Sequence, residues 1–231
     1  MNFLRIPKFA AAKTSSLALV TLPKPLHPTL AELQRHPKPT SVRKILAMTA
    51  TPGGPLIRPD DIGGKSAWQL LLRENKLELV FDDFAIAPGT TLTTENRAQT
   101  VKAKVPSPYV TAGLTAAWVY CGTGPLEHLE LSRKQGLRGF IPRTEATTTW
   151  TSVGLDKVTA RIAGLRLTDE NRTIADVAAR HPTKVALPWI LRLVENGADL
   201  KAARKALEHR YRVVGREQAR KTLTKAAALI G

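Results

Sequence analysis

Four long polar side chains near residue 70 recur at a helical spacing: Lys65, Gln69, Arg73 and Lys76. On a helix that runs from about Lys65 to Asn75, these side chains fall within about 80° of one another. Arginine and lysine can address guanine edges, glutamine can address adenine, and any of the three can hold a phosphate. We therefore expect this face of the helix to bind DNA.

The opposite side of the same helix is apolar, as a helix that packs against a core requires. Ala67, Leu70 and Leu71 are expected to occupy it, with Trp68 on the flank. The predicted set of DNA contacts also includes Ser66, which begins the helix and should contact a phosphate, and Arg58.

The elements around this helix follow the order of a winged helix-turn-helix, in which the last helix enters the major groove. The sequence predicts a helix over residues 42–48, a one-turn helix that starts at Pro59, the Gly63–Gly64 turn, the helix described above, and a hairpin over residues 77–87. The tip of the hairpin is Asp82–Asp83, whose charge would repel a phosphate backbone. We therefore expect the wing not to be a strong DNA contact.

A second basic set lies near the C-terminus: Arg212, Arg216, Arg220, Lys221 and Lys225. The three arginines recur every four residues, as do the two lysines, so that part of a helix over residues 215–229 would present a continuous basic stripe, with Ala219, Leu223 and Ala226 on another side. We expect this stripe to add phosphate contacts without sequence preference, or to meet an acidic protein partner.

The charge of the 231-residue chain agrees with a polyanionic partner. Its 35 lysines and arginines exceed its 19 acids by 16. Residues 1–59 and residues 180–231 each carry a net charge of +8, and the residues between them are neutral. Nucleic acid is the first candidate for a partner and an anionic membrane surface the second. The low aromatic content, 5%, gives no stacking platform for single-stranded RNA.

The sequence predicts an α+β fold in which the winged helix-turn-helix precedes a mixed α/β domain that ends in a helical bundle. We expect a disordered basic arm over residues 1–39, the winged domain over 40–88, a linker with a short helix over 89–108, and the second domain over 109–231. The second domain is expected to open with a buried helix over 109–122. Its expected strands cover residues 126–131, 139–143, 150–153 and 157–162, and its expected helices cover 168–180, 184–196, 199–211 and 215–229. Residues 164–167 lead into the first of these helices, with Thr168 as its expected cap.

Enzyme chemistry finds little support in the residues, and we predict no catalytic residue, cofactor or metal. Gly63-Gly64-Lys65-Ser66 ends like a phosphate-binding loop but lacks the first glycine at the required spacing. The five histidines are dispersed, and the one cysteine, Cys121, excludes a four-thiolate zinc site and an internal disulfide. The single cysteine agrees with a reducing cytoplasm, and no apolar run is long enough to span a membrane.

Three stretches of the chain resemble the AbiEi-like antitoxin and transcriptional-regulator family of type IV toxin–antitoxin systems in bacteria. They cover residues 55–87, residues 113–120, and residues 164–178 with the Arg172-Thr-x-x-Asp176 segment. The resemblance extends over residues 40–231. Arg172 and Asp176 lie four residues apart on a predicted helix, so we expect them to pair and to order the domain.

The resemblance implies a two-domain regulator that binds operator DNA at its own promoter. In antitoxin members of the family, the C-terminal domain carries the activity against a nucleotidyltransferase-like toxin. The chain is thus predicted to be a DNA-binding autoregulator, a repressor, and the antitoxin of such a pair. A basic protein–protein or RNA-associated module with a degenerate winged helix is the alternative.

Overall fold

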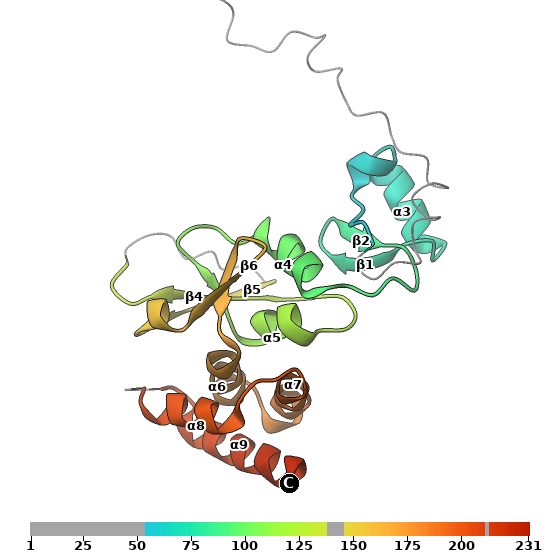
Figure 1. The fold of residues 1–231 in the computed structure, drawn as a ribbon. Coiled ribbons are helices and arrows are strands. Elements are labelled where there is room, and N and C mark those ends of the chain that lie inside the picture. Colours follow the sequence, from blue (N-terminus) through green and yellow to red (C-terminus); the bar gives the residue numbers. More distant parts are fainter. Residues whose placement is uncertain (1–53, 138–145, 211–212) are drawn as a thin grey trace, which may run out of the picture. The chain divides into compact units, whose positions relative to one another are not determined.

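The computed structural model describes residues 54–137, 146–210 and 213–231, which form a mixed α+β structure (Figure 1). All of them belong to one compact unit that extends from Lys38 to Gly231. Several sequence predictions fall outside the described residues: the arm over 1–39, the helix over 42–48, the strand over 139–143, and Arg212. Among the helices that are described, none is both long and apolar enough to cross a membrane.

The first described elements are a 3₁₀ turn, a helix and a hairpin: η1 (Pro59–Ile62), α3 (Lys65–Arg73), β1 (Glu78–Phe81) and β2 (Phe84–Ile86). Gly63 and Gly64 separate η1 from α3 with φ angles of +94° and +98°, which other residues adopt only with strain. The strands pair antiparallel, with Glu78 opposite Ile86. Ile57, which precedes η1, adds an antiparallel bridge to Ala85 of β2, so the segment that leads to the helix is joined to the hairpin.

The hairpin is apolar on both sides because it lies between two clusters of buried side chains. Leu77 and Ala85 pack in one cluster with Trp68 of α3. Val80 and Phe84 belong to the larger cluster, which also contains residues of the central sheet. Burial on both sides explains the short apolar runs that predicted the hairpin.

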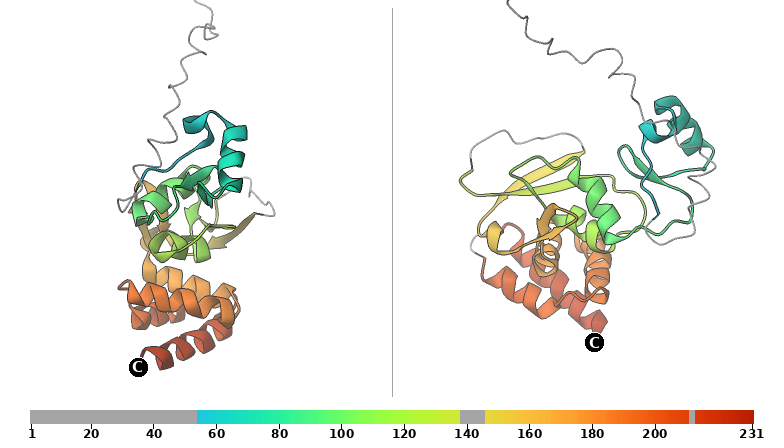
Figure 2. Two further views of the ribbon diagram at one scale, coloured as in Figure 1. Left: turned by 90° about the vertical axis from the view of Figure 1, so that its right-hand side faces the viewer. Right: turned by 45° about the horizontal axis from the view of Figure 1, so that its top comes forward.

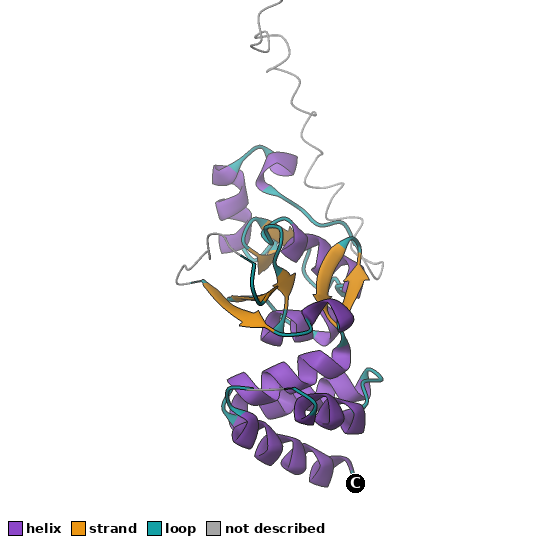
Figure 3. Ribbon diagram, turned by 90° about the vertical axis from the view of Figure 1, so that its left-hand side faces the viewer, coloured by secondary structure: helices purple, strands orange, loops and turns teal. Residues whose placement is uncertain are grey.

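The central sheet has five strands: β3 (Val110–Thr111), β4 (Leu129–Lys134), β5 (Thr147–Ser152), β6 (Thr159–Ile162) and β7 (Leu165–Thr168). Their order across the sheet is β5-β4-β3-β7-β6. In Figure 3 the strands are orange, and the C-terminal helices lie below them. β3 runs parallel to β7 and antiparallel to β4, while β4 and β5 are parallel to each other and β6 and β7 form an antiparallel pair. The sheet is therefore mixed.

The buried helix predicted over residues 109–122 is shorter than expected, because its first residues form the central strand β3. The helix α5 (Gly113–Cys121) begins at Gly113, whose φ is +55°. A side chain at this position would overlap the carboxylate of Glu130. That carboxylate accepts a hydrogen bond of 2.7 Å from the backbone N–H of Leu114, so it caps the helix from a neighbouring strand.

The strand predicted over residues 126–131 begins three residues later, at Leu129. The backbone N–H of Leu126 donates instead to the carbonyl of Val80 in the hairpin, over 2.8 Å. This contact joins the hairpin to the segment that enters the sheet. The alternation of apolar residues over 126–131 therefore did not show where the strand of the central sheet begins, because the first of these residues pairs with the hairpin instead.

The helices α4 (Thr94–Lys102) and α5 pack together beside the sheet. The short helix expected inside the 89–108 connection is α4, and its Ala98 and Val101 are fully buried. α5 places Ala116 and Val119 in the cluster of the sheet and Ala117 in the cluster of the C-terminal helices. Small and apolar residues all round α5 are explained by this position between two cores.

The C-terminal part consists of four helices: α6 (Glu170–Arg180), α7 (Thr183–Glu195), α8 (Leu200–Glu208) and α9 (Arg216–Ile230) (Figure 2). Their bounds agree closely with those predicted. The sequence indicates Thr168 as the cap of α6, but the cap is Asp169, which accepts from the N–H of Arg172 over 2.7 Å. From the sequence, Pro188 is expected in the first turn of a helix over 184–196; α7 begins at Thr183, so Pro188 lies farther inside it.

Candidate nucleic-acid interface

The polar face predicted for the helix near residue 70 is present on α3. Lys65, Ser66, Gln69 and Arg73 are all exposed, and Lys76, just beyond the helix, is exposed as well. Within the described part of the chain, none of the four long side chains Lys65, Gln69, Arg73 and Lys76 has a hydrogen bond or ion pair. Their donors are therefore free to bind a ligand.

The apolar side of α3 differs from the prediction in one residue. Leu70 is 52% exposed, and the residue that is buried is Trp68, at 6%. Leu71 and Leu72 pack beside Trp68 against Ile62. The helix is rotated relative to the expected face because the large indole, and not Leu70, fills the space above the hairpin. Leu70 thus lies next to Ser66 and Arg73 on the exposed face.

The acidic tip of the hairpin is neutralised by cations. Asp82 pairs with Lys104, and Asp83 accepts a hydrogen bond of 2.7 Å from Arg58. Partial burial opposes the charge of Asp83, but the hydrogen bond and the charge of Arg58 hold the pKa of its carboxyl below the usual value. Arg58 also lies over the ring of Phe84 at 5.2 Å. Of the predicted DNA contacts, Arg58 is thus the one already engaged.

The predicted C-terminal stripe is divided between free and paired cations. Arg220 binds Glu208 of α8 through two hydrogen bonds of 2.8 and 2.6 Å, and this contact lowers the pKa of the Glu208 carboxyl. Lys221 and Lys225 are exposed and have no such partner among the described residues. Arg216 is half-buried at the first turn of α9. α9 therefore does not present one continuous basic stripe.

The pairing expected between Arg172 and Asp176 is confirmed. Nε of Arg172 lies 2.9 Å from Oδ2 of Asp176, and both side chains are almost fully buried. Arg210 binds the other carboxylate oxygen over 2.7 Å. Burial lowers the pKa of Arg172, and the charge of Asp176 opposes that shift. The network joins α6 to the end of α8, so its role is to hold the helices together.

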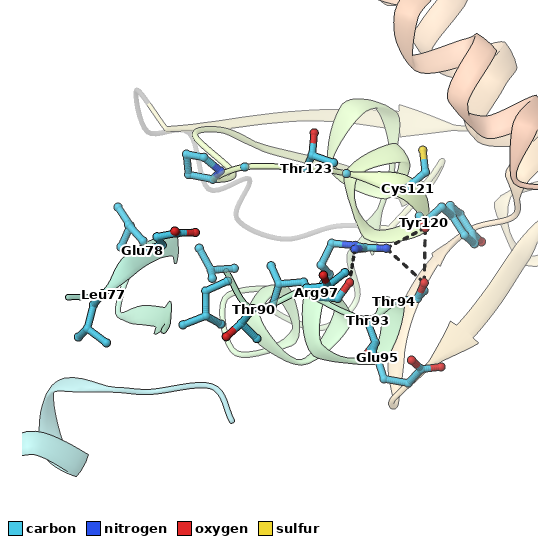
Figure 4. Close-up of a pocket in the computed structure, with 18 of the residues that line it drawn as sticks. Leu77, Glu78, Thr90, Thr93, Thr94, Glu95, Arg97, Tyr120, Cys121 and Thr123 are labelled. Atoms are coloured by element: carbon cyan, nitrogen blue, oxygen red, sulfur yellow. Dashed lines mark hydrogen bonds between the residues drawn. The ribbon is translucent and has the colours of Figure 1, made fainter. Parts of the chain in front are cut away.

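A cavity of about 1080 Å³ lies between β1, the segment 90–97 and the end of α5 (Figure 4). Its one arginine, Arg97, is 7% exposed. The guanidinium donates to the carbonyls of Val119 and Tyr120, each over 2.9 Å, and to that of Leu92 over 2.8 Å. These are mostly the last carbonyls of α5, which attract a cation.

Sequence reasoning missed Arg97, because its partners on α5, Val119 and Tyr120, lie more than twenty residues away along the chain and no spacing marks them. Its role is structural, since its donors are used within the chain. Burial lowers its pKa. Among the described residues, no group of histidine, cysteine, aspartate and glutamate side chains could hold a metal ion.

Comparison with known proteins gives little further information. No protein-family model and no curated protein matches the chain. Among solved structures, the crystal structure of the RV2827C protein from Mycobacterium tuberculosis is similar over 81% of this chain and 74% of that chain, with 13% identity and a TM-score of 0.39. A likeness of this size establishes neither a shared family nor a shared function.

Proposed function

We propose that the chain is a sequence-specific DNA-binding regulator that acts at its own promoter. In this proposal η1, α3 and the hairpin, together with the helix predicted over residues 42–48, form a winged helix-turn-helix. α3 enters the major groove, where Gln69, Arg73 and Lys65 face base edges and Ser66 contacts a phosphate.

The observation that supports the proposal most strongly is the unpaired face of α3. On most surface helices, long cations are solvated or bound to neighbouring acids. Here the two acids at the tip of the hairpin, Asp82 and Asp83, are paired with Lys104 and Arg58. Among the described residues, the cations of α3 form no ion pair, so their N–H donors remain available to a partner.

The hairpin has a positioning role in the proposal and does not grip DNA. Phe81 and Phe84 are buried, and the tip is bound to Arg58 and to Lys104 beyond the hairpin. A wing fixed in this way holds α3 at a constant orientation to the C-terminal body. Sequence readout requires such rigidity, because base contacts depend on the placement of each donor.

We further propose that the chain is the antitoxin of a nucleotidyltransferase-like toxin, in a bacterial cytoplasm. This part rests on the family resemblance of residues 55–87, 113–120 and 164–178. The C-terminal helices with the free cations Lys221 and Lys225 offer a surface for an acidic protein or for additional phosphates.

Binding to two duplexes tests the proposal. The full chain is titrated by fluorescence anisotropy with its own upstream DNA and with a scrambled duplex of equal length and composition, at one salt concentration. We expect tighter binding to the upstream DNA. The double substitution Gln69→Ala and Arg73→Ala should remove this preference, whereas Arg204→Ala, which removes a free cation of α8, should preserve it.

Equal affinity of the unaltered chain for both duplexes would contradict sequence-specific readout. The alternative function, a basic protein–protein or RNA-associated module with a degenerate winged helix, would then be favoured. The observation that supports this alternative is the hairpin, whose tip is acidic and held by Arg58 and Lys104.

A further inference from the structure

A hollow of about 560 Å³ lies where α6 ends and α7 begins, beside α9. It is lined by residues 179–184 and by Gln218. The cations at its edge are Arg180 and Lys184, and both are exposed. This hollow is distant in sequence from the proposed DNA-reading face.

The guanidinium of Arg180 is held by stacking on an aromatic ring and not by hydrogen bonds from its N–H donors. The group lies over the ring of Trp150 at 3.9 Å from the centroid. Within the described chain it forms no hydrogen bond and no ion pair. Because the N–H donors lie in the plane of the guanidinium, a stack leaves them available for an oxyanion. Burial lowers the pKa of Arg180, and the charges of Asp176 and Glu130 oppose this shift.

The two carboxylates near Arg180 are already bound to other groups. Glu130 accepts from Leu114 and lies 2.9 Å from Nε2 of His181. Asp176 is held by Arg172 and Arg210. The charges of both acids act on Arg180 and oppose the lowering of its pKa by burial, but neither acid forms an ion pair with Arg180 among the described residues.

Lys184 also lacks a partner among the residues that the structure describes. It lies in the first turn of α7, four residues after Arg180. The amide nitrogen of Gln218 donates to Thr183 over 2.8 Å and to Thr222 over 3.3 Å, which fixes the wall of the hollow on the side of α9. The hollow thus combines the stacked guanidinium of Arg180 with the exposed ammonium of Lys184.

We propose that this hollow binds a phosphoryl group. The in-plane donors of Arg180 suit two phosphate oxygens, and Lys184 supplies a second positive charge. The group can belong to a small phosphate compound or to a nucleic-acid backbone, since the chemistry recognised is the same. The proposal does not depend on sequence-specific binding by α3.

Inorganic phosphate is the probe for the first experiment, followed by the amide signals of the ¹⁵N-labelled full chain. We expect saturable shifts centred on residues 180–184 and Gln218. The double substitution Arg180→Gln and Lys184→Gln should weaken binding by about tenfold or more, since each removes a charge-assisted hydrogen bond. The matched control, Lys201→Gln and Lys205→Gln on α8, should leave the affinity unchanged.

The absence of saturable shifts would overturn the proposal, as would equal weakening by the two double substitutions, because either result leaves only general charge attraction. Lys184→Gln alone, which does not touch the stack of Arg180 on Trp150, separates lost binding from lost folding and should also weaken binding.

A short DNA duplex as second probe identifies the source of the phosphoryl group. A lower duplex affinity of the Arg180 and Lys184 variant, relative to its control, assigns the hollow to a nucleic-acid backbone. Unchanged duplex affinity together with lost phosphate binding assigns it to a small phosphate compound. The Gln69→Ala and Arg73→Ala variant should bind inorganic phosphate normally, so failure of the DNA proposal and failure of this one are distinguishable.

Discussion

The exposed face of α3 and the basic side of α9 have similar patterns in the sequence and different states in the structure. Both carry cations at intervals of about one helical turn. On α3 the cations Lys65 and Arg73 have no partner within the described residues. On α9, Arg220 is bound by Glu208 and lies 3.7 Å from Glu217. Spacing thus predicts which residues share a face, but not which of them are available to a ligand.

The difference arises from the neighbours of each helix. α9 packs beside α8, whose last residue, Glu208, lies opposite Arg220. α3 packs on the hairpin, where the acids are held by Arg58 and Lys104. A salt bridge between exposed groups contributes little stability, but it removes a cation from the surface that a polyanion would meet.

The largest expected effect concerns the buried ion pair of Arg172 and Asp176, in which the arginine is not available to any ligand. Asp176→Ala would leave Arg172 buried without its carboxylate, and should lower the free energy of unfolding by about 3–5 kcal/mol. Urea denaturation measures this change. Glu208→Ala, which removes the exposed ion pair with Arg220, should lower the free energy of unfolding much less. A similar loss in both variants would show that burial does not make the Arg172–Asp176 pair more important for stability than the exposed pair.

The next largest effect concerns the exposed face of α3, which carries Arg73. Arg73→Ala should reduce affinity for the upstream DNA by about 1–3 kcal/mol if Arg73 reads a base, and relax the preference at one position. Anisotropy titration over a set of single-base variants of the duplex measures both quantities. Arg204→Ala removes an equivalent exposed charge from α8. A uniform loss over all duplexes would instead assign Arg73 to a phosphate.

A third prediction compares the two halves of α9. Lys221→Glu with Lys225→Glu should weaken DNA binding equally on all sequences, and should flatten the salt dependence by about one unit of slope for each lost phosphate contact. Arg216→Glu with Arg220→Glu should change the slope less, because Arg220 is already bound to Glu208. Unchanged slopes in both variants, with intact toxin neutralisation, would make the stripe an ordinary charged surface.

The smallest expected effect concerns the tip of the hairpin. The pKa of Asp83 lies below its usual value, so its pairing with Arg58 stabilises the fold at neutral pH and this contribution is lost as the pH falls. Asp83→Asn should lower the free energy of unfolding at pH 7 by about 0–1 kcal/mol. The difference from the unaltered chain should shrink below about pH 4, where the unfolded chain also takes up the proton.

Asp60→Asn, which changes a nearby exposed carboxyl, serves as the control for that measurement. If Arg58 gains freedom when Asp83 is replaced, the same variant should bind DNA more tightly. Unchanged DNA affinity would show that Arg58 is not a DNA contact even when it is free.

Periodicity in the sequence was sufficient for the helices. The bounds of α3 and α6–α9 follow closely from runs of apolar residues at helical spacing and from local breaks at Gly63, Gly197 and Gly215. The pair of Arg172 and Asp176 is expected from the same spacing, because residues four apart on a helix lie on one face. These features depend on interactions within a few residues, which the sequence displays directly.

The tertiary structure alone decided the features that depend on contacts distant in sequence. Val110 and Thr111 form the central strand, and not part of a helix, because β7 and β4 pair with them. Leu70 is exposed because Trp68 fills the space above the hairpin. The free state of Arg73, the bound state of Arg220 and the stack of Arg180 on Trp150 likewise depend on elements many residues away. Charge and spacing determine where such side chains can lie, and packing determines which of them remain available.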